Sequence, residues 1–354
     1  MPKTVIDCLV IGGGIIGASV AHQAAGRHPG WDIHLLDPRG IGSGTTASSA
    51  GLYVPFGATT EIRSLVRDGL PAFSAYRSWV ADDTIRDLRF LVVLRTTARN
   101  DLLAMMTGGA AHEPTADDLD WFAHRYPECD LAGQEIIRLD GAFRVRAGEL
   151  AGQLATASPN VRFVAASAQV VRRREQGWVV EHDAGTTAAA RVILSVGPWM
   201  LPVLDLPAPS ALDAPGRRKR VAAMHAYNAP KADDRAVYFL DDDVFLLPEP
   251  RLGYTIASFY LDRWSQPPGS GDPVPAPADQ AVGRAALARR IGPAFAATCG
   301  GGRAGTDVYQ PQRLPAVLAL DPDSTLLFAG AGSGSGVRLA PGIATRVVGC
   351  LTAA

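Results

Sequence analysis

The stretch that decides the fold is VIDCLVIGGGIIG, residues 5–17. Its first seven residues are mostly apolar and have the length of a strand. Three glycines follow at Gly12, Gly14 and Gly17 in the spacing G-x-G-x-x-G, and an alanine-rich stretch of helical character continues to about Arg27. This order predicts a buried strand, a tight glycine turn and a helix.

A second apolar run and an acidic residue complete the pattern. Residues 33–36, Ile-His-Leu-Leu, are followed by Asp37, which stands twenty residues after Gly17. Strand, glycine turn, helix, strand and acid in this order form the dinucleotide-binding fingerprint. Gly12 permits the tight turn, Gly14 lets the backbone approach a pyrophosphate, and Gly17 lets the helix pack close to the strand. The helix N-terminus attracts the phosphates, and we expect Asp37 to bind the adenosine ribose.

Length and composition restrict the class of protein. The chain has 354 residues, of which 47% are hydrophobic and 19% charged, and its net charge is −1; this suits a soluble protein of about two domains. The near-neutral charge argues against nucleic acid as a partner, and no apolar run reaches the roughly 18 residues of a membrane span. The first residues lack the features of a signal peptide. The four cysteines show no C-x-x-C or metal spacing, so we expect reduced thiols and a cytoplasmic protein.

Small and polar residues follow Asp37, from Gly40 to Tyr53. They cannot fill a core, so the segment is either a flexible loop or a loop that lies along a flat ligand. The preceding fingerprint favours the second alternative. Apolar spacing then predicts helices over 61–80 and 117–124, with Thr115 as the N-cap of the second.

From residue 161 onward the pattern changes to strands. They are predicted at 161–164, 168–173, 177–182, 189–196, 237–240, 244–248 and 254–260. The fourth run is apolar and stops before Gly197, as a parallel strand does where its backbone meets a ligand. The three acids at 241–243 predict a hairpin turn rather than a metal site. A helix over about 279–291 follows.

A second unit of strand, glycine turn and helix lies near the end of the chain. Leu326 to Gly330 is a predicted strand, glycines recur at every second position from 330 to 336, and a helix is predicted from about Ile343 to Leu351. Such a turn presents backbone N–H groups to a second polar part of the same ligand.

These segments together resemble one family, that of D-amino-acid oxidase, glycine oxidase, sarcosine oxidase and D-arginine dehydrogenase. The resemblance rests on the Rossmann-like start, the Thr45–Gly51 loop, the Val192–Trp199 strand and the Gly330–Pro341 turn, and it covers nearly the whole chain. It implies an α/β flavoprotein, α+β overall, with an FAD-binding domain and a mostly antiparallel substrate domain. The FAD domain then comprises 1–54, 145–205 and 305–354, and the substrate domain 55–144 and 206–304.

The resemblance also implies the residues that contact FAD. They are Gly12, Gly14, Ile15, Ile16, Gly17, Asp37, Pro38, Arg39, Ser43, Thr45, Thr46, Ser49, Ala50, Gly51, Leu52, Val170, Ser195, Gly197, Trp199, Gly330, Gly332, Gly334, Ser335, Gly336, Val337 and Arg338. Asp37 and the first glycines would hold the ADP half, Val170 the adenine side, and the 332–337 turn would run past the flavin ring.

The family chemistry is the removal of a hydride from the carbon next to an amine to flavin N5, which leaves an imine that hydrolyses. The protein must hold the amine neutral, hold the C–H bond near N5 and exclude water. Burial in an apolar pocket shifts an amine of pKa about 10 toward its neutral form. No dedicated base is required, so no catalytic residue is assigned. The electron acceptor, oxygen or another, and the oligomeric state stay open.

The chain departs from the family at the position that binds the substrate carboxylate. Amino-acid oxidases often carry an arginine there, and this chain has Asp307, which would repel a carboxylate and favour a cation, or bond a neighbouring loop. Arg338 falls where sarcosine oxidase has a basic residue; it binds an anion or forms a buried ion pair, with Asp307 among its candidate partners. We therefore expect a larger or decorated amine as substrate.

Further positions bear on the cofactor and the substrate. The 307–311 stretch lacks the cysteine that attaches the flavin in sarcosine oxidase, so FAD is expected to be non-covalent. Thr255 or a neighbour stands where that enzyme has an oxygen-activating lysine, which weakens the case for an oxidase and leaves room for a dehydrogenase. The expected substrate-binding residues are Tyr53, Tyr254, Asp307, Tyr309 and Arg338, with Phe56, His225, Tyr227 and Tyr238 as further candidates.

Three other functions remain as alternatives. An NAD-dependent dehydrogenase has no use for the late glycine turn, and a flavin monooxygenase normally carries a Gly-Asp pair where this chain reads Gly-Ser-Gly-Ser-Gly. A non-catalytic flavin-binding protein that has lost its carboxylate clamp is the third alternative.

Overall fold

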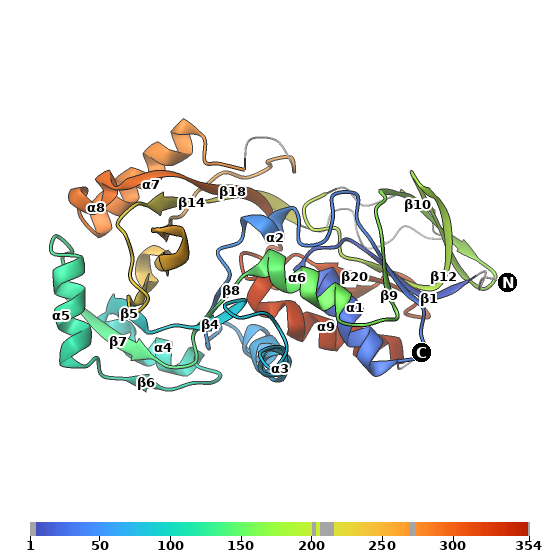
Figure 1. Cartoon of the computed structure of the whole chain (residues 1–354), viewed down its shortest axis with the longest axis horizontal. Coiled ribbons are helices and arrows are strands. Elements are labelled where there is room, and N and C mark those ends of the chain that lie inside the picture. The colour runs from blue at the N-terminus through green and yellow to red at the C-terminus, as the bar shows by residue number, and fades with distance from the viewer. Residues whose placement is uncertain (1–4, 200–202, 206–215, 269–272, 353–354) are drawn as a thin grey trace.

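The computed structural model describes residues 5–199, 203–205, 216–268 and 273–352, and three β-sheets organise them (Figure 1). The first sheet contains β1 (Ile6–Ile11), β2 (Ile33–Leu36), β9 (Val161–Val164), β10 (Ala168–Arg174), β11 (Gly177–His182), β12 (Gly185–Leu194), β13 (Val203–Asp205), β19 (Ala316–Ala319) and β20 (Leu326–Gly330). The second contains β5 (Phe90–Arg95), β6 (Ala111–His112), β7 (Gln134–Leu139), β14 (Arg217–Ala226), β15 (Ala236–Phe239), β16 (Val244–Glu249), β17 (Tyr254–Ser258) and β18 (Cys299–Tyr309). The small third sheet contains β3 (Leu52–Tyr53), β4 (Ile85–Asp87) and β8 (Phe143–Val145).

The helices connect and cover these sheets. They are α1 (Ile15–Arg27), α2 (Thr45–Ser48), α3 (Thr60–Tyr76), α4 (Arg99–Met105), α5 (Ala116–Arg125), α6 (Ala147–Thr156), α7 (Pro277–Arg290), α8 (Pro293–Ala297) and α9 (Gly336–Thr352). Short 3-10 turns span Thr96–Ala98, Leu240–Asp242 and Pro250–Leu252. The combination of helices with parallel and antiparallel strands confirms the predicted α/β class, α+β overall.

The parallel part of the first sheet aligns the ends of its central strands. β1 lies between β2 and β12, and Ile11 pairs with both Leu36 and Leu194. The residues that follow these strands, Gly12, Asp37 and Ser195, therefore meet at one edge of the sheet. Ligands of open parallel sheets bind at this carboxyl edge.

One helical layer packs on the first sheet. Alanines of α1 and apolar side chains of α9 share a buried cluster with β1 and β20, and Figure 1 shows α1, α6 and α9 gathered there. Small side chains such as Ala18 and Ala21 let the helices approach closely. Because β1 and β20 both run parallel to β12, the glycine turns that follow them lie at the same edge of the sheet.

The second sheet has two different faces. One face packs against α5, α7 and α8 through a cluster that includes Phe122, Leu287 and Phe295. The other face packs against the segment after β3, where Val54 and Phe56 contact the strands. Three helices therefore cover the outer face, whereas the inner face meets Leu102 of α4 and is directed at the loops of the first sheet.

Several predicted boundaries differ from the structure. The last helix begins at Gly336, seven residues before the predicted start, because buried Val337, Leu339 and Ala340 pack against the core and override weak helix formers such as Pro341. The helix predicted over 61–80 ends at Tyr76. The predicted domain division stays a prediction; its boundary at residue 305 falls inside β18, which pairs with β14 along its length.

Candidate active site

The first glycine turn joins β1 to α1 with very little space. Gly12 has a φ of +108°, in the region that favours glycine. A Cβ atom on Gly17 would lie 1.9 Å from Gly12 O, so only glycine lets the helix begin this close to the strand. Gly14 is the N-cap of α1 and makes no side-chain capping bond. The geometry suits a pyrophosphate at the helix N-terminus.

Asp37 lies beside this turn at the end of β2. Its carboxylate accepts hydrogen bonds from Gly13 N at 2.9 Å and from Arg39 N at 2.8 Å, so it links the two βα connections. The Arg39 guanidinium lies 3.7 Å from the centre of the Trp199 ring, a cation–π contact. Three residues predicted to contact FAD are thus brought together.

The loop after Asp37 is held on several sides. Thr46 Oγ1 accepts from Ile15 N at 3.0 Å, and Thr45 donates to Thr306 O at 2.6 Å. Ser49 Oγ accepts from Gly51 N at 3.1 Å. Because these bonds reach α1, β18 and the loop itself, the segment is a fixed loop rather than a free one. Its side chains connect the first glycine turn to the inner face of the second sheet.

The late glycine turn lies between β20 and α9. Ala331, Ser333 and Gly334 all have positive φ values, so three of its residues are in the left-handed region. Asp307 accepts from Gly334 N at 2.7 Å and from Val308 N at 2.8 Å. Burial is the larger effect and raises the pKa of Asp307 above its usual value, although these two backbone hydrogen bonds offset part of the rise. Of the two predicted roles of Asp307, the structure shows the bond to a neighbouring loop.

Arg338 lies in the first turn of α9. Its guanidinium donates to Phe56 O at 2.7 Å and to Ser335 Oγ at 2.9 Å, and burial lowers its pKa. The predicted pairing of Arg338 with Asp307 is wrong, because Asp307 is occupied by the backbone of the late turn. The anion-binding role of Arg338 stays a prediction.

An aromatic cluster lies on the inner face of the second sheet. His225 stacks on Tyr254 with ring centres 3.8 Å apart. Arg303 donates to Tyr254 Oη at 3.1 Å and to Ser49 O at 3.1 Å, which joins the cluster to the predicted FAD loop. Burial, with a smaller contribution from the Arg303 charge, lowers the pKa of His225 to about 4, and its Nε2 atom is buried with no hydrogen-bond partner among the described residues. Arg303 was not predicted, because its role depends on which strand β18 pairs with.

The other predicted residues are distributed around these groups. Tyr309 lies near the late turn, since a Cβ atom on Gly334 would stand 2.7 Å from its hydroxyl. Tyr53 is different: it is 1% exposed and stacks on Phe143 within the helix-side core. Val170 is half-buried on β10, where it pairs with Glu181 of β11 and not with a residue of either glycine turn.

The remaining predicted FAD contacts follow the two turns. Ser195 donates its backbone N–H to Ile11 O at 2.7 Å. Gly197 follows at a φ of +59° beside the Trp199 ring. Four others lie on connecting segments, Pro38, Ser43, Ala50 and Gly332, and five lie at the ends of helices or strands, Ile16, Leu52, Gly330, Gly336 and Val337.

Thr255 does not face this site. Its side chain is 1% exposed and donates from Oγ1 to the Asn228 side chain at 2.9 Å. In the register of β17, neighbouring Ile256 belongs to the inner-face cluster and Ala257 to the outer one, so Thr255 shares the outer face with Ala257. The identity of the residue at position 255 therefore does not indicate which electron acceptor the protein uses.

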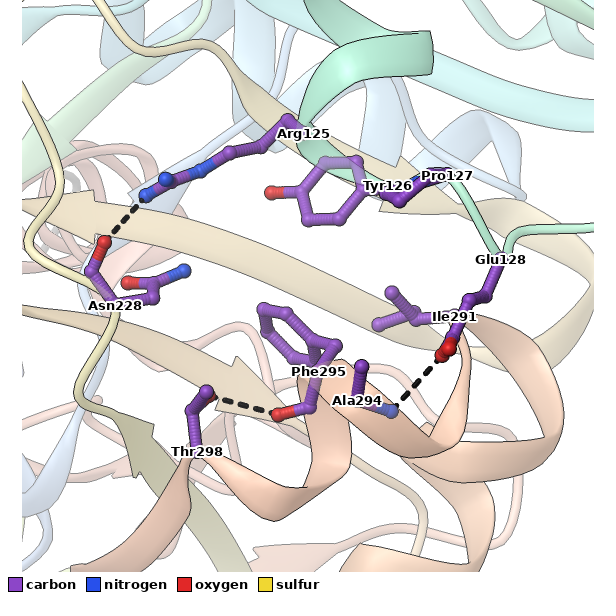
Figure 2. Close-up of a pocket in the computed structure, with 9 residues that line it drawn as sticks. All are labelled: Arg125, Tyr126, Pro127, Glu128, Asn228, Ile291, Ala294, Phe295 and Thr298. Atoms are coloured by element: carbon purple, nitrogen blue, oxygen red, sulfur yellow. Dashed lines mark hydrogen bonds between the residues drawn. The ribbon is translucent and has the colours of Figure 1, made fainter.

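A shallow pocket occurs elsewhere, on the outer side of the second sheet. Figure 2 shows Arg125 and Tyr126 at the end of α5 on one side and Phe295 and Thr298 on the other. Arg125 donates to Asn228 O at 2.9 Å, and Glu128 accepts from Ala294 N at 2.9 Å. Its polar groups thus bond one another, and none of the predicted site residues lines it.

The described residues lack two features that would bear on function. They contain no group of three or more His, Cys, Asp or Glu side chains placed to hold a metal ion. No helix in the same part of the chain has the length and apolar character needed to cross a membrane.

Comparison with known proteins identifies the family. A profile described as FAD dependent oxidoreductase matches residues 7–348 of the chain. The chain belongs to this family. A curated relative, the 4-methylaminobutanoate oxidase (formaldehyde-forming) of Paenarthrobacter nicotinovorans, is 30% identical over 228 residues, which is 60% of this chain and 26% of the relative. The oxidoreductase thus spans about a quarter of the length of that relative.

Several solved structures have a similar fold. Glycine oxidase from Geobacillus kaustophilus has a TM-score of 0.76 at 17% identity, covering 99% of this oxidoreductase and 95% of that chain. L-proline dehydrogenase from P. horikoshii has a TM-score of 0.76 at 15% identity, with 100% and 94% covered. Iminodiacetate oxidase from Chelativorans sp. BNC1 has a TM-score of 0.73 at 17% identity, covering 98% of this oxidoreductase and 95% of that chain.

Proposed function

We propose that this FAD-dependent oxidoreductase removes a hydride from the carbon next to an amine nitrogen and leaves an imine. The curated relative is named as an oxidase of a methylated amine, which supports this reaction class. The observation that carries the proposal is the inner face of the second sheet, where Phe56, Tyr238, Tyr254 and Ile256 form an apolar and aromatic wall. An amine held against such a wall loses its proton more readily than in water.

Separate groups of residues would bind FAD and the substrate. FAD, when bound, accepts the two electrons and the hydrogen that leave the substrate carbon. The N-terminus of α1 and Asp37 would hold its ADP half, and the late turn would lie along its ring system. The aromatic wall would exclude water and orient the C–H bond. His225 is neutral above a pH of about 4, and its Nε2, which has no partner among the described residues, would accept a hydrogen bond from the substrate amine without taking its proton.

Non-covalent binding of FAD is part of the proposal. The described thiol on β18, Cys299, belongs to the outer-face cluster, and burial raises its pKa to about 11. The thiol of Cys8 is fully buried in β1 and lies among core side chains. A thiolate that could attack a flavin ring needs a lowered pKa and access to it, and these two cysteines have neither.

An absorbance spectrum of the purified protein, followed by anaerobic addition of a panel of amines and amino acids, tests the proposal. We expect a flavin band that acid precipitation releases into solution and that a secondary or tertiary amine bleaches. Readmission of air then distinguishes an oxidase, which recolours quickly, from a dehydrogenase. A flavoprotein that no amine reduces would contradict the reaction class, and a flavin band that stays with the precipitate would contradict non-covalent binding.

A further inference from the structure

Lys219 presents an ammonium group on the inner face of the second sheet. It lies on β14 directly opposite Asp307 of β18. Residues that face each other across antiparallel strands project from the same side of the sheet. Asp307 bonds Gly334 N of the late turn, so Lys219 shares a face with the group that holds this turn.

Three aromatic rings surround the Lys219 ammonium. Its Nζ atom lies 3.7 Å from the centre of the Tyr260 ring and 5.3 Å from those of Trp264 and Tyr309. The residue is only 6% exposed. Aromatic faces attract a cation, but they offer no acceptor oxygen to its three N–H donors.

The acids near Lys219 are engaged elsewhere. Within the described residues no carboxylate lies within 4.0 Å of its Nζ. Asp243 accepts instead from Tyr238 Oη at 3.0 Å, and Asp262 from Trp264 Nε1 at 2.7 Å. Burial is the largest effect on the pKa of Lys219 and lowers it; the charges of the two acids raise it, and that of Arg313 lowers it. Lys219 is therefore buried, and its ammonium N–H donors have no acceptor among the described residues.

Among the other cations of this region, Arg217 is exposed and stacks on Trp264, and two arginines nearer the late turn are hydrogen-bonded. Arg303 bonds Ser49 O and the Tyr254 hydroxyl, and Arg338 bonds Phe56 O and the Ser335 hydroxyl. A continuous series of contacts, from Arg338 through Phe56 and Tyr238 to Asp243, connects the late turn with the surroundings of Lys219.

We propose that Lys219 binds an anionic group of the substrate, and that this group is separated from the oxidised carbon by several bonds. The inference rests on the proposed amine oxidation. A carboxylate attached directly to the oxidised carbon would approach β18, where Asp307 offers it no donor because its oxygens accept from Val308 N and Gly334 N. Lys219 lies one strand further from the late turn, and neighbouring strands are about 4.8 Å apart. The substrate class is therefore an amine with a remote carboxylate, such as an ω-(methylamino) acid.

The test compares amines that differ only in the anionic end. Purified holoprotein is titrated anaerobically with N-methylamino acids of increasing chain length and with the matched N-methylalkylamines, and the Kd comes from flavin reduction. Plain alkanoates, which cannot be oxidised, are titrated by the change in flavin absorbance they cause. The proteins are wild type, Lys219→Met, Lys219→Arg and, as matched control, Lys231→Met, which changes an exposed lysine.

We expect wild type to bind the longer methylamino acids more tightly than N-methylglycine and the alkylamines. Lys219→Met should raise the Kd of the long amino acids and of alkanoates by about 10- to 100-fold, the loss of one hydrogen bond to a charged group, and should leave the alkylamines within about threefold. Lys219→Arg should retain part of the affinity, and Lys231→Met all of it.

Two results would overturn the inference. One is a Lys219→Met protein that binds alkanoates and long amino acids with wild-type Kd. The other is a wild-type protein that binds alkylamines as tightly as the matched amino acids; this comparison also decides the matter if Lys219→Met fails to fold. A flavin that no amine reduces, with alkanoate binding that depends on Lys219, would refute the proposed reaction and support the anion site.

Discussion

Substituting Gly17 by alanine tests whether the close approach of α1 to β1 holds the cofactor site. The new Cβ atom would stand 1.9 Å from Gly12 O, and real Cβ contacts stay above 3.0 Å. The helix and the turn must therefore separate by about 1.1 Å. Overpacking of this kind costs about 1–3 kcal/mol, and the better helix propensity of alanine offsets about 1 kcal/mol. We expect the free energy of unfolding to fall by up to about 2 kcal/mol.

The effect on FAD should exceed the effect on stability. The backbone N–H groups of the turn move with the helix, and a hydrogen bond to a charged phosphate contributes about 1.5–3 kcal/mol. Displacing one such bond raises the Kd for FAD by about 10- to 100-fold. Fluorescence titration of FAD into the apoprotein measures this Kd, and urea unfolding measures the stability.

Gly26 provides the matched control within the same helix. A Cβ atom there would meet nothing within 4 Å. Gly26→Ala should therefore bind FAD as wild type does. Its free energy of unfolding should equal that of wild type or exceed it by up to about 1 kcal/mol, which raises the urea midpoint accordingly. The reasoning is refuted if Gly17→Ala retains the wild-type Kd for FAD and the wild-type urea midpoint.

Three further predictions concern the second sheet. Arg303→Met removes the bond to Ser49 O and should raise the Kd for FAD about tenfold; an unchanged Kd in the flavin titration would count against this link. Because the pKa of His225 is about 4 when folded and about 6.5 when unfolded, the unfolded chain takes up a proton first and stability falls as the pH drops from 6.5 to 4. His225→Gln should flatten the urea midpoint across that window, and an equal slope in both proteins would exclude His225 as the cause. Glu249→Ala leaves the buried Arg144 guanidinium unpaired and should cost about 3–5 kcal/mol, whereas adding Arg144→Met should recover most of the loss; additive losses in this double-mutant cycle would show that the two residues are not coupled.

The sequence predicts the FAD-binding half of the fold because its signals are local. The glycine spacing after β1, the apolar runs of strand length and the acid at position 37 are all read from neighbouring residues, and the structure places Gly12 and Asp37 at one sheet edge. The turn at residues 241–243 is confirmed for the same reason, since Asp243 adopts the left-handed conformation between β15 and β16.

The sequence misleads where packing outweighs local preference. Glycine and proline near the start of α9 disfavour a helix, but its apolar face is buried against the core and the helix forms from Gly336 onward. Asp307 raises the same difficulty. Its charge left open a contact with a cation or a bond to a neighbouring loop, and only the structure shows that two backbone N–H groups, one of them from the late turn, occupy the carboxylate.

By itself the sequence determined the family, the dinucleotide turn and the α/β class, because short-range spacing specifies backbone conformation. Only the tertiary structure decided which side chains meet on the inner face of the second sheet. The pairing of β14 with β18 places Lys219 opposite Asp307, eighty-eight residues later in the chain, and a bond from Arg303 reaches Ser49, 254 residues away. Strand pairing sets such neighbours over long sequence separations, and no local pattern records them.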